Sequence, residues 1–144
     1  MAPGMNAPLY TTDILRLAAN LPEPKPLERV DGRAEERSPT CGSSIVAEVQ
    51  LGEEGRVVAV SQRVQACAFG QASAALLSRG AQGRSRDEVA AALQEISDWL
   101  GGNSDAPGSW PGVATLEPAR SRRSRHGAIL LPFRALVAAM DSGR

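Results

Sequence analysis

The two cysteines, Cys41 and Cys67, are the residues best suited to chemistry, because they are the only thiols in this chain of 144 residues. Cys41 lies in Ser38-Pro39-Thr40-Cys41-Gly42-Ser43, directly before a predicted strand, and Cys67 lies directly before a predicted helix. At a helix N-terminus the dipole and the unpaired N–H groups favour a thiolate, which binds metals and attacks sulfur. A free cysteine is also often a small buried residue. The spacing alone therefore leaves a reactive site and a core position open.

The segments that must position these cysteines are two predicted strands. Residues 44–51 alternate apolar and polar side chains with the period of two that a half-buried strand requires. Residues 56–66 do the same after a short turn at 52–55, so the pair predicts an antiparallel hairpin. A hairpin brings the start of one strand beside the end of the other. We therefore expect Cys41 and Cys67 to be neighbours in space.

Helices are predicted on both sides of the hairpin. Apolar residues at helical spacing indicate helices at 9–21, 68–79, 85–100 and from about 125 to 140. Thr11 or Thr12 is available as the N-cap of the first. Ser85 and Glu88 form a capping box for the third.

Proline sets two further boundaries. A helix tolerates proline in its first turn, so Pro132 predicts that the last helix becomes regular only near Ala128 or Ile129. Residues 22–37 hold three prolines followed by a charged stretch, and we interpret them as a connector.

The whole pattern predicts an α+β fold, with a small antiparallel β-sheet packed against several helices. We expect a disordered N-terminus at 1–8 and a single domain at 9–141.

The charge balance and the apolar runs exclude several classes of function. Sixteen Lys and Arg residues balance sixteen Asp and Glu residues, so no global field attracts nucleic acid or an anionic membrane. No apolar run approaches the roughly 18 residues of a spanning helix, and no signal-peptide pattern is present. Two cysteines outside a C-x-x-C pair form no disulfide framework, which favours the cytoplasm. No nucleophile–base pair or phosphate loop is recognisable, so we expect no enzyme.

Two other features are interpreted as structural. Trp110 lies in a loop rich in proline and glycine and is expected to anchor that loop on the core. The arginines at 120, 122, 123 and 125 are expected to form a solvated face.

The motifs together resemble the IscU/NifU-type family of iron–sulfur cluster assembly scaffolds, the NifU N-terminal domain, over most of the chain. The family's Pro-x-Cys-Gly segment at the start of a hairpin is matched by Pro39-Thr40-Cys41-Gly42. Its cysteine followed by a helix of small residues is matched by Cys67-Ala68-Phe69-Gly70-Gln71-Ala72-Ser73-Ala74. Its Arg-x-x-Cys segment, with an aromatic residue five places after the cysteine, is similar to residues 125–136. The three motifs occur in the family's order.

The resemblance implies a metal site with four ligands, of which this chain keeps two. Family members usually offer three cysteines and an aspartate directly after the Cys-Gly pair, and these four hold zinc or the nascent cluster. Cys41 and Cys67 match two of the cysteines. Ser43 stands at the aspartate position and is a poor metal ligand, and Ala128 stands at the third cysteine position and cannot bind metal.

The sole histidine, His126, is a candidate third ligand, because it lies two positions before the lost cysteine. Two thiolates and one imidazole would leave an open site, completed by a small thiol, a partner's side chain or water. A lone histidine among arginines is also typical of an exposed residue at the start of a helix. The cofactor implied is a transient iron–sulfur cluster of the [2Fe–2S] type, or zinc.

Two functions follow from the resemblance. The first is a scaffold or carrier that receives sulfur from a cysteine desulfurase and passes a cluster to apo iron–sulfur client proteins. The alternative is a degenerate scaffold paralogue that binds assembly partners without building a cluster, which the substitutions at Ser43 and Ala128 favour. A thiol redox protein with a Cys41–Cys67 disulfide is a weaker third, because the C-x-x-C motif is absent.

Overall fold

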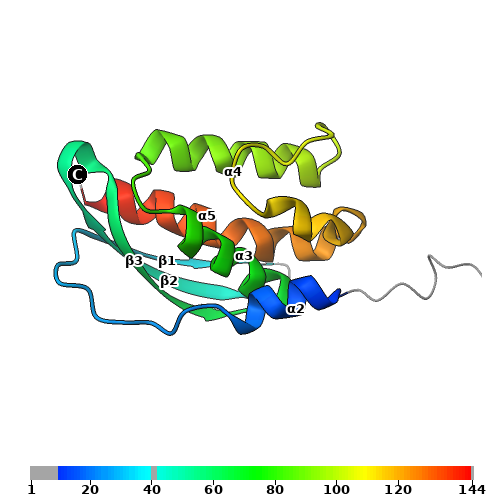
Figure 1. Cartoon of the computed structure of the whole chain (residues 1–144), viewed down its shortest axis with the longest axis horizontal. Coiled ribbons are helices and arrows are strands. Elements are labelled where there is room, and N and C mark those ends of the chain that lie inside the picture. Colours follow the sequence, from blue (N-terminus) through cyan, green and yellow to red (C-terminus); the bar gives the residue numbers. More distant parts are fainter. Residues whose placement is uncertain (1–9, 40–41, 144) are drawn as a thin grey trace, which may run out of the picture.

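The structure is a computed structural model that describes residues 10–39 and 42–143. The predicted disordered segment 1–8, Leu9 and Cys41 therefore lie outside the described residues. The elements, with the labels of Figure 1, are the helices α2 (Thr12–Ala19), α3 (Ala68–Gly80), α4 (Arg86–Leu100) and α5 (Arg123–Ser142), the strands β1 (Gly32–Arg37), β2 (Ser44–Leu51) and β3 (Val57–Gln65), and the 3-10 helices η1 (Glu53–Gly55) and η2 (Val113–Ser121).

The three strands form one antiparallel sheet in the order β1-β2-β3, and the helices pack on one of its faces (Figure 1). Helices α3 and α5 lie directly on the sheet, α2 lies beside α3, and α4 covers α5 from outside. The fold is therefore the predicted α+β arrangement. The predicted hairpin is also confirmed, because β2 and β3 pair with Ser44 opposite Gln65.

The core lies between the sheet and the helices. Its largest fully buried side chains come from α2, β2, α3, α4, η2 and α5: Ile14, Ile45, Val49, Phe69, Leu77, Ile96, Leu116, Ile129, Leu131, Phe133, Leu136 and Met140. Alternation along β2 directs Ile45, Ala47 and Val49 to the helices, as its period of two requires. No helix in the described part of the chain is long and apolar enough to cross a membrane.

The interpretation of residues 22–37 as a connector is wrong for its last part, because Gly32–Arg37 forms the edge strand β1. Its composition concealed the strand, since four of its six residues are charged and only Gly32 and Ala34 are small. Charged side chains are common on edge strands, where they oppose pairing with other chains. Gly32 is required here, because a side chain at this position would collide with the Ala139 carbonyl of α5.

The predicted start of the last helix is also wrong. Helix α5 is regular from Arg123, so Pro132 lies near its middle and not in its first turn. Proline has no N–H, so the carbonyl of Ala128 loses its usual partner one turn ahead. The buried Ser73 hydroxyl of α3 donates to the neighbouring Ile129 carbonyl at 2.6 Å. This contact ties α3 to α5 at the residue after the carbonyl that the proline leaves without its helical partner.

The predicted caps agree with the structure. The Thr11 hydroxyl accepts the Ile14 N–H at the start of α2, although this helix is shorter than the predicted 9–21. Ser85 and Glu88 form both hydrogen bonds of the capping box on α4. These local signals fix where the helices begin.

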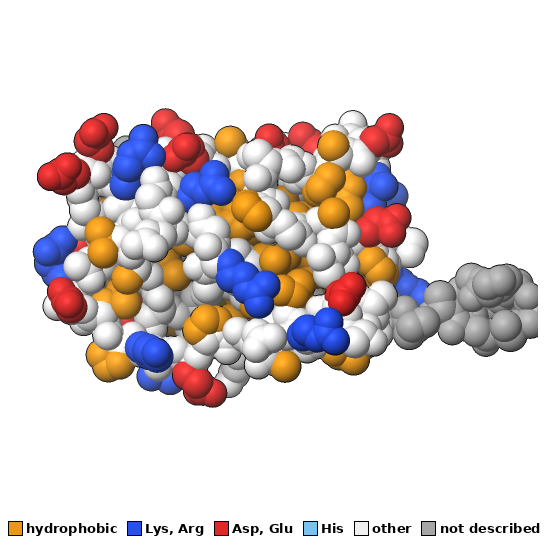
Figure 2. Space-filling view, viewed as in Figure 1, with side chains coloured by type: hydrophobic (Ala, Val, Ile, Leu, Met, Phe, Trp, Pro, Cys, Tyr) orange, Lys and Arg blue, Asp and Glu red, His pale blue; other side chains and the backbone are white. Residues whose placement is uncertain are grey.

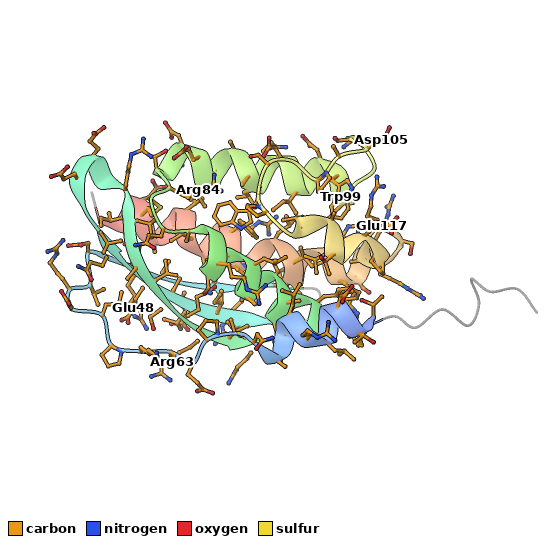
Figure 3. All side chains as sticks on the ribbon, viewed as in Figure 1. Glu48, Arg63, Arg84, Trp99, Asp105 and Glu117 are labelled. Atoms are coloured by element: carbon orange, nitrogen blue, oxygen red, sulfur yellow. The ribbon has the colours of Figure 1, made fainter. Side chains whose placement is uncertain are left out.

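Trp110 anchors its loop, as predicted. Its indole N–H donates to the Leu76 carbonyl at 2.9 Å, and its ring meets Phe133 edge-on at 5.0 Å. The guanidinium of Arg84, labelled in Figure 3, lies 4.7 Å from the centre of the indole ring.

The expectation of a solvated arginine face is wrong for Arg120. Its guanidinium lies over Trp99, also labelled in Figure 3, and donates to the carbonyls of Trp99 and Ser104. Arg120 therefore ties η2 to the end of α4, whereas Arg122 and Arg123 are exposed.

Candidate functional site

Cys67 is the N-cap of α3, as the sequence predicts. Its backbone is extended, with φ −66° and ψ 174°, and its side chain is a half-buried free thiol. Within the described residues the thiol makes no capping hydrogen bond. It therefore lies beside the unpaired first-turn N–H groups of α3, at the positive end of the helix.

Gln71 holds the backbone on both sides of Cys67. Its side-chain amide donates to the Ala66 carbonyl at 2.9 Å, and its backbone N–H donates to the Cys67 carbonyl at 2.9 Å. The junction between β3 and α3 is thereby closed by one residue. The two bonds hold the backbone at Cys67 in place.

The loop between β1 and β2 contains Cys41, and both of its ends are described. The Ser38 N–H donates to the Ser43 carbonyl at 2.8 Å, and the Gly42 N–H donates to the Ser38 carbonyl at 3.2 Å. Gly42 has φ +73°, a left-handed conformation that favours glycine. The pairing of β2 with β3 brings this end of β2 beside the end of β3 that leads to α3. The described flanks of both cysteines thus lie at one end of the sheet, and the proximity of the two sulfur atoms stays a prediction.

Ala128 of α5 reaches the same end of the sheet through α3. A Cβ atom placed on Gly70, in the first turn of α3, would lie 3.3 Å from the Ala128 Cβ and 2.6 Å from the Ala66 Cβ. Only glycine lets β3, α3 and α5 approach so closely. Ala128 is 1% exposed and faces the helical turn that Cys67 caps. The position that the family resemblance assigns to a third cysteine therefore packs against the first turn of α3, which Cys67 caps.

Ser43 is the other substituted position, and it is also buried, at 4% exposed. It directly precedes β2 and accepts a backbone hydrogen bond from Ser38. Its hydroxyl is neutral and carries no fixed charge for a metal. Among the described residues no group of three or more His, Cys, Asp and Glu side chains could hold a metal ion.

His126 lies on another side of α5. Its Nε2 atom is 2.8 Å from the carbonyl oxygen of Ala119 in η2. A carbonyl only accepts, so Nε2 carries the hydrogen and donates it, which leaves the lone pair of a neutral ring on Nδ1. Two residues turn an α-helix by about 200°, so His126 and Ala128 leave α5 in nearly opposite directions. The structure thus brings Ala128, and not His126, to the turn that Cys67 caps.

Comparison with solved structures gives the family. The chain superposes on a nitrogen-fixing NifU-like protein (N-terminal) from Brucella abortus with a TM-score of 0.85 and 30% identity, covering 93% of each chain. The chain belongs to the NifU-like N-terminal domain family. This confirms the resemblance drawn from the motifs.

A second structure shares the fold of this NifU-like chain at lower identity. It is a protein of thermophilic Fervidobacterium islandicum AW-1 assigned as an iron–sulfur cluster assembly scaffold for the SUF system. The TM-score is 0.82 and the identity 17%, covering 92% of this chain and 96% of that one. No protein-family model and no curated protein matches the chain.

Sequence reasoning missed the contact that joins the elements of this NifU-like site. Gly70 interrupts a run of good helix formers, and a glycine inside a predicted helix often marks a close approach of another backbone. That signal pointed to the packing of α3 against a neighbour. It did not identify Ala128 as the residue that packs there, because that depends on how the helices are arranged in three dimensions.

Proposed function

We propose that this chain is a scaffold or carrier in iron–sulfur cluster assembly, and that Cys41 and Cys67 bind iron or a [2Fe–2S] cluster, or zinc, as cargo. The observation that carries the proposal is the half-buried Cys67 thiol at the N-cap of α3, at the end of the sheet where the Cys41 loop is anchored. The NifU-like fold supports it, as does the likeness to a protein assigned as a cluster scaffold.

The chemistry begins with sulfur transfer. A cysteine desulfurase, the partner we propose, would offer a persulfide. The Cys67 thiolate attacks its outer sulfur, a new S–S bond forms on Cys67, and the S–S bond of the donor breaks to release the desulfurase thiolate. No oxidant or reductant is consumed, because one persulfide replaces another. The unpaired N–H groups at the N-terminus of α3 lie beside the attacking sulfur, where negative charge is favoured.

The cargo is expected to bind loosely. A tetrahedral site needs four ligands, and this chain offers two thiolates at the proposed site. His126, the candidate third ligand, leaves α5 away from the turn that Cys67 caps, and its Nε2 lies against the Ala119 carbonyl. Water, a small thiol or a partner's side chain would complete the set. An open site exchanges its cargo readily, which suits transfer to apo iron–sulfur client proteins. We propose no enzymatic turnover, no nucleic-acid or membrane partner, and a location in a reducing cytoplasm that preserves thiolates.

A second function is favoured by one observation. Ser43 and Ala128 are both buried and uncharged, and they stand at two of the four positions where the family has metal ligands. A paralogue that binds assembly partners without building a cluster would tolerate this loss.

Anaerobic reconstitution with iron and sulfide separates the two functions. A scaffold should develop visible sulfur-to-iron charge-transfer absorption that Cys67→Ala and Cys41→Ala both remove, with iron and sulfide bound in equal amounts. Leu15→Ala, an exposed change on α2, is the matched control and should keep the absorption. If the folded parent protein developed no absorption, the better function would be the second one, an interaction module that binds assembly partners without building a cluster.

A further inference from the structure

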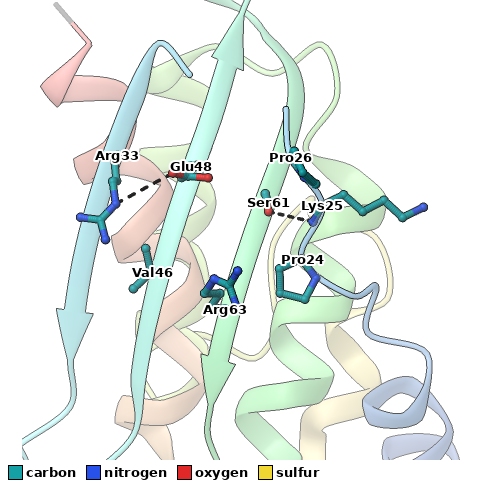
Figure 4. A pocket seen from close by; sticks show the side chains of 8 residues that line it. All are labelled: Pro24, Lys25, Pro26, Arg33, Val46, Glu48, Ser61 and Arg63. Carbon is teal, nitrogen blue, oxygen red and sulfur yellow. Dashed lines mark hydrogen bonds and ion pairs between the residues drawn. The ribbon is translucent and has the colours of Figure 1, made fainter. Parts of the chain in front are cut away.

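A pocket of about 320 Å³ lies on the open face of the sheet, opposite the helices and apart from the proposed cluster site (Figure 4). Its floor is made by Val46 of β2 and Ser61 of β3, and the extended segment 24–26 forms one wall. Glu48 and Arg63, also in its lining, lie on the side of the sheet away from the helices in Figure 3. All three strands contribute to it.

The wall is held in place before any ligand arrives. The Lys25 N–H donates to the Ser61 hydroxyl at 3.2 Å, which fastens the segment to β3. Pro24 and Pro26 stand on either side of Lys25, and each proline ring fixes its own backbone dihedral. Strand and proline walls lose little freedom on binding. A preformed pocket therefore loses less conformational entropy when a ligand binds.

Arg63 and Lys25 are the two cations of this pocket for which the described residues provide no ion pair, and the Lys25 side chain extends away from the strands in Figure 4. Figure 4 shows the Arg63 guanidinium directed into the space between β2 and the proline wall. Arg33, on the opposite side, lies 3.9 Å from both Glu35 and Glu48. Those distances exceed hydrogen-bond length, so its N–H donors stay available to a ligand.

We propose that this pocket binds a carboxylate group. A guanidinium presents two parallel N–H donors that match the two oxygens of a carboxylate. Arg63 supplies this fork, Arg33 adds a second positive charge, and the Ser61 hydroxyl adds a polar contact. Glu48 also lines the pocket and repels anions, so a singly charged carboxylate is preferred to a doubly charged phosphate. The carboxylate comes from a small acid or from an acidic side chain of a protein that lies on the open face.

The test is an NMR titration of the ¹⁵N-labelled chain at constant ionic strength. Its three probes are sodium acetate, the peptide acetyl-Gly-Glu-Glu-Gly-amide and inorganic phosphate. Acetate and the peptide should give saturable shifts of the amides of Val46, Ser61 and Arg63. A peptide affinity at least tenfold above that of acetate assigns the site to a protein side chain, and equal affinities assign it to a small acid.

Matched variants decide whether Arg63 is responsible. Arg63→Gln should weaken acetate and peptide binding at least tenfold. Arg134→Gln, which removes an exposed arginine on α5, should leave binding unchanged, and circular dichroism verifies both folds. Glu48→Gln should raise the affinity for phosphate relative to acetate. The proposal is overturned by an absence of saturable carboxylate shifts, by tighter binding of phosphate than of acetate to the parent chain, or by Arg63→Gln binding as the parent does.

Discussion

The Ser73 hydroxyl of α3 donates a 2.6 Å hydrogen bond to the Ile129 carbonyl of α5, and both residues are fully buried. Ile129 directly follows Ala128, which faces the turn capped by Cys67. The hydrogen bond therefore holds the candidate site and the proline-containing part of α5 in one arrangement. Loss of this hydrogen bond should therefore lower the stability of the fold and also change the geometry of the candidate site.

Ser73→Ala should lower the free energy of unfolding by about 1–3 kcal/mol, because a buried carbonyl loses a partner that water cannot replace. The midpoint of urea denaturation measures the effect. Ser124→Ala, at an exposed position of α5, should change it by less than about 0.5 kcal/mol. Equal effects of the two substitutions would mean that the contact between the helices adds nothing.

Gly70→Ala should destabilise the protein by about 1–3 kcal/mol through overpacking, although alanine is the better helix former. The new Cβ would lie 2.6 Å from that of Ala66, so β3, α3 and α5 must move apart. Thermal unfolding measures the change. Ala91→Gly, at an exposed position of α4, shows the scale of helix propensity alone, about 1 kcal/mol. A stabilising Gly70→Ala would show that these elements yield without strain.

Asp31 should make stability depend on pH in acid. The Arg29 guanidinium, and after it the Leu51 N–H, hold the pKa of this carboxyl below its usual value. A lowered folded-state pKa stabilises the fold above the unfolded pKa of about 4, and this contribution is lost as the pH falls through the folded value. Denaturation midpoints between pH 6 and pH 2 should fall less steeply for Asp31→Asn than for the parent. Glu117→Gln, at an exposed site, is the control and should follow the parent curve.

The elements that the sequence predicted well are those whose signals are local. Strand β2 alternates along its length, and the capping box of Ser85 and Glu88 announces the start of α4. Cys67 was placed at the start of α3 for the same reason, since a run of small helix formers begins directly after it. Such signals need no knowledge of distant residues.

The features that were missed depend on contacts between distant segments. Strand β1 has four charged residues out of six, and its pairing with β2 identifies it as a strand. Pro132 suggested a late start of α5, because a helix tolerates proline best in its first turn. The long α5 is packed between the sheet and α4, and nothing near Pro132 in sequence reveals that packing. The Cys41 loop could be placed at an end of the sheet, but the distance between the two sulfur atoms stays a prediction.

His126→Ala should leave metal content unchanged while lowering stability by about 1 kcal/mol, because the ring donates to the Ala119 carbonyl on the η2 side of α5. Cys67→Ala and Cys41→Ala should each abolish metal binding. Metal analysis of protein purified without oxygen, together with urea denaturation, provides both measurements. Reduced metal content in the histidine variant would make the imidazole a third ligand. Full metal content in both cysteine variants would remove the thiolate site.

Ser43→Asp combined with Ala128→Cys should restore a closed set of four ligands and bind zinc at least tenfold more tightly than the parent. Ala128 faces the first turn of α3 across Gly70, and Ser43 directly precedes β2 at the same end of the sheet, so both new groups would adjoin the proposed site of Cys67 and Cys41. Four protein ligands need no exchangeable donor, and the gained affinity also stabilises the fold.

Competition of zinc against a chelator measures this gain, and each single variant should show only part of it. Ala135→Cys is the matched control, because it adds a thiol at another buried position of α5, about two turns away along the same side. That thiol lies too far from Cys67 to share an ion with it, so zinc affinity should stay at the parent value. If the double variant and the control bound zinc equally, the thiol at 128 would not face the cysteines. The interaction module would then be the better account of this NifU-like chain.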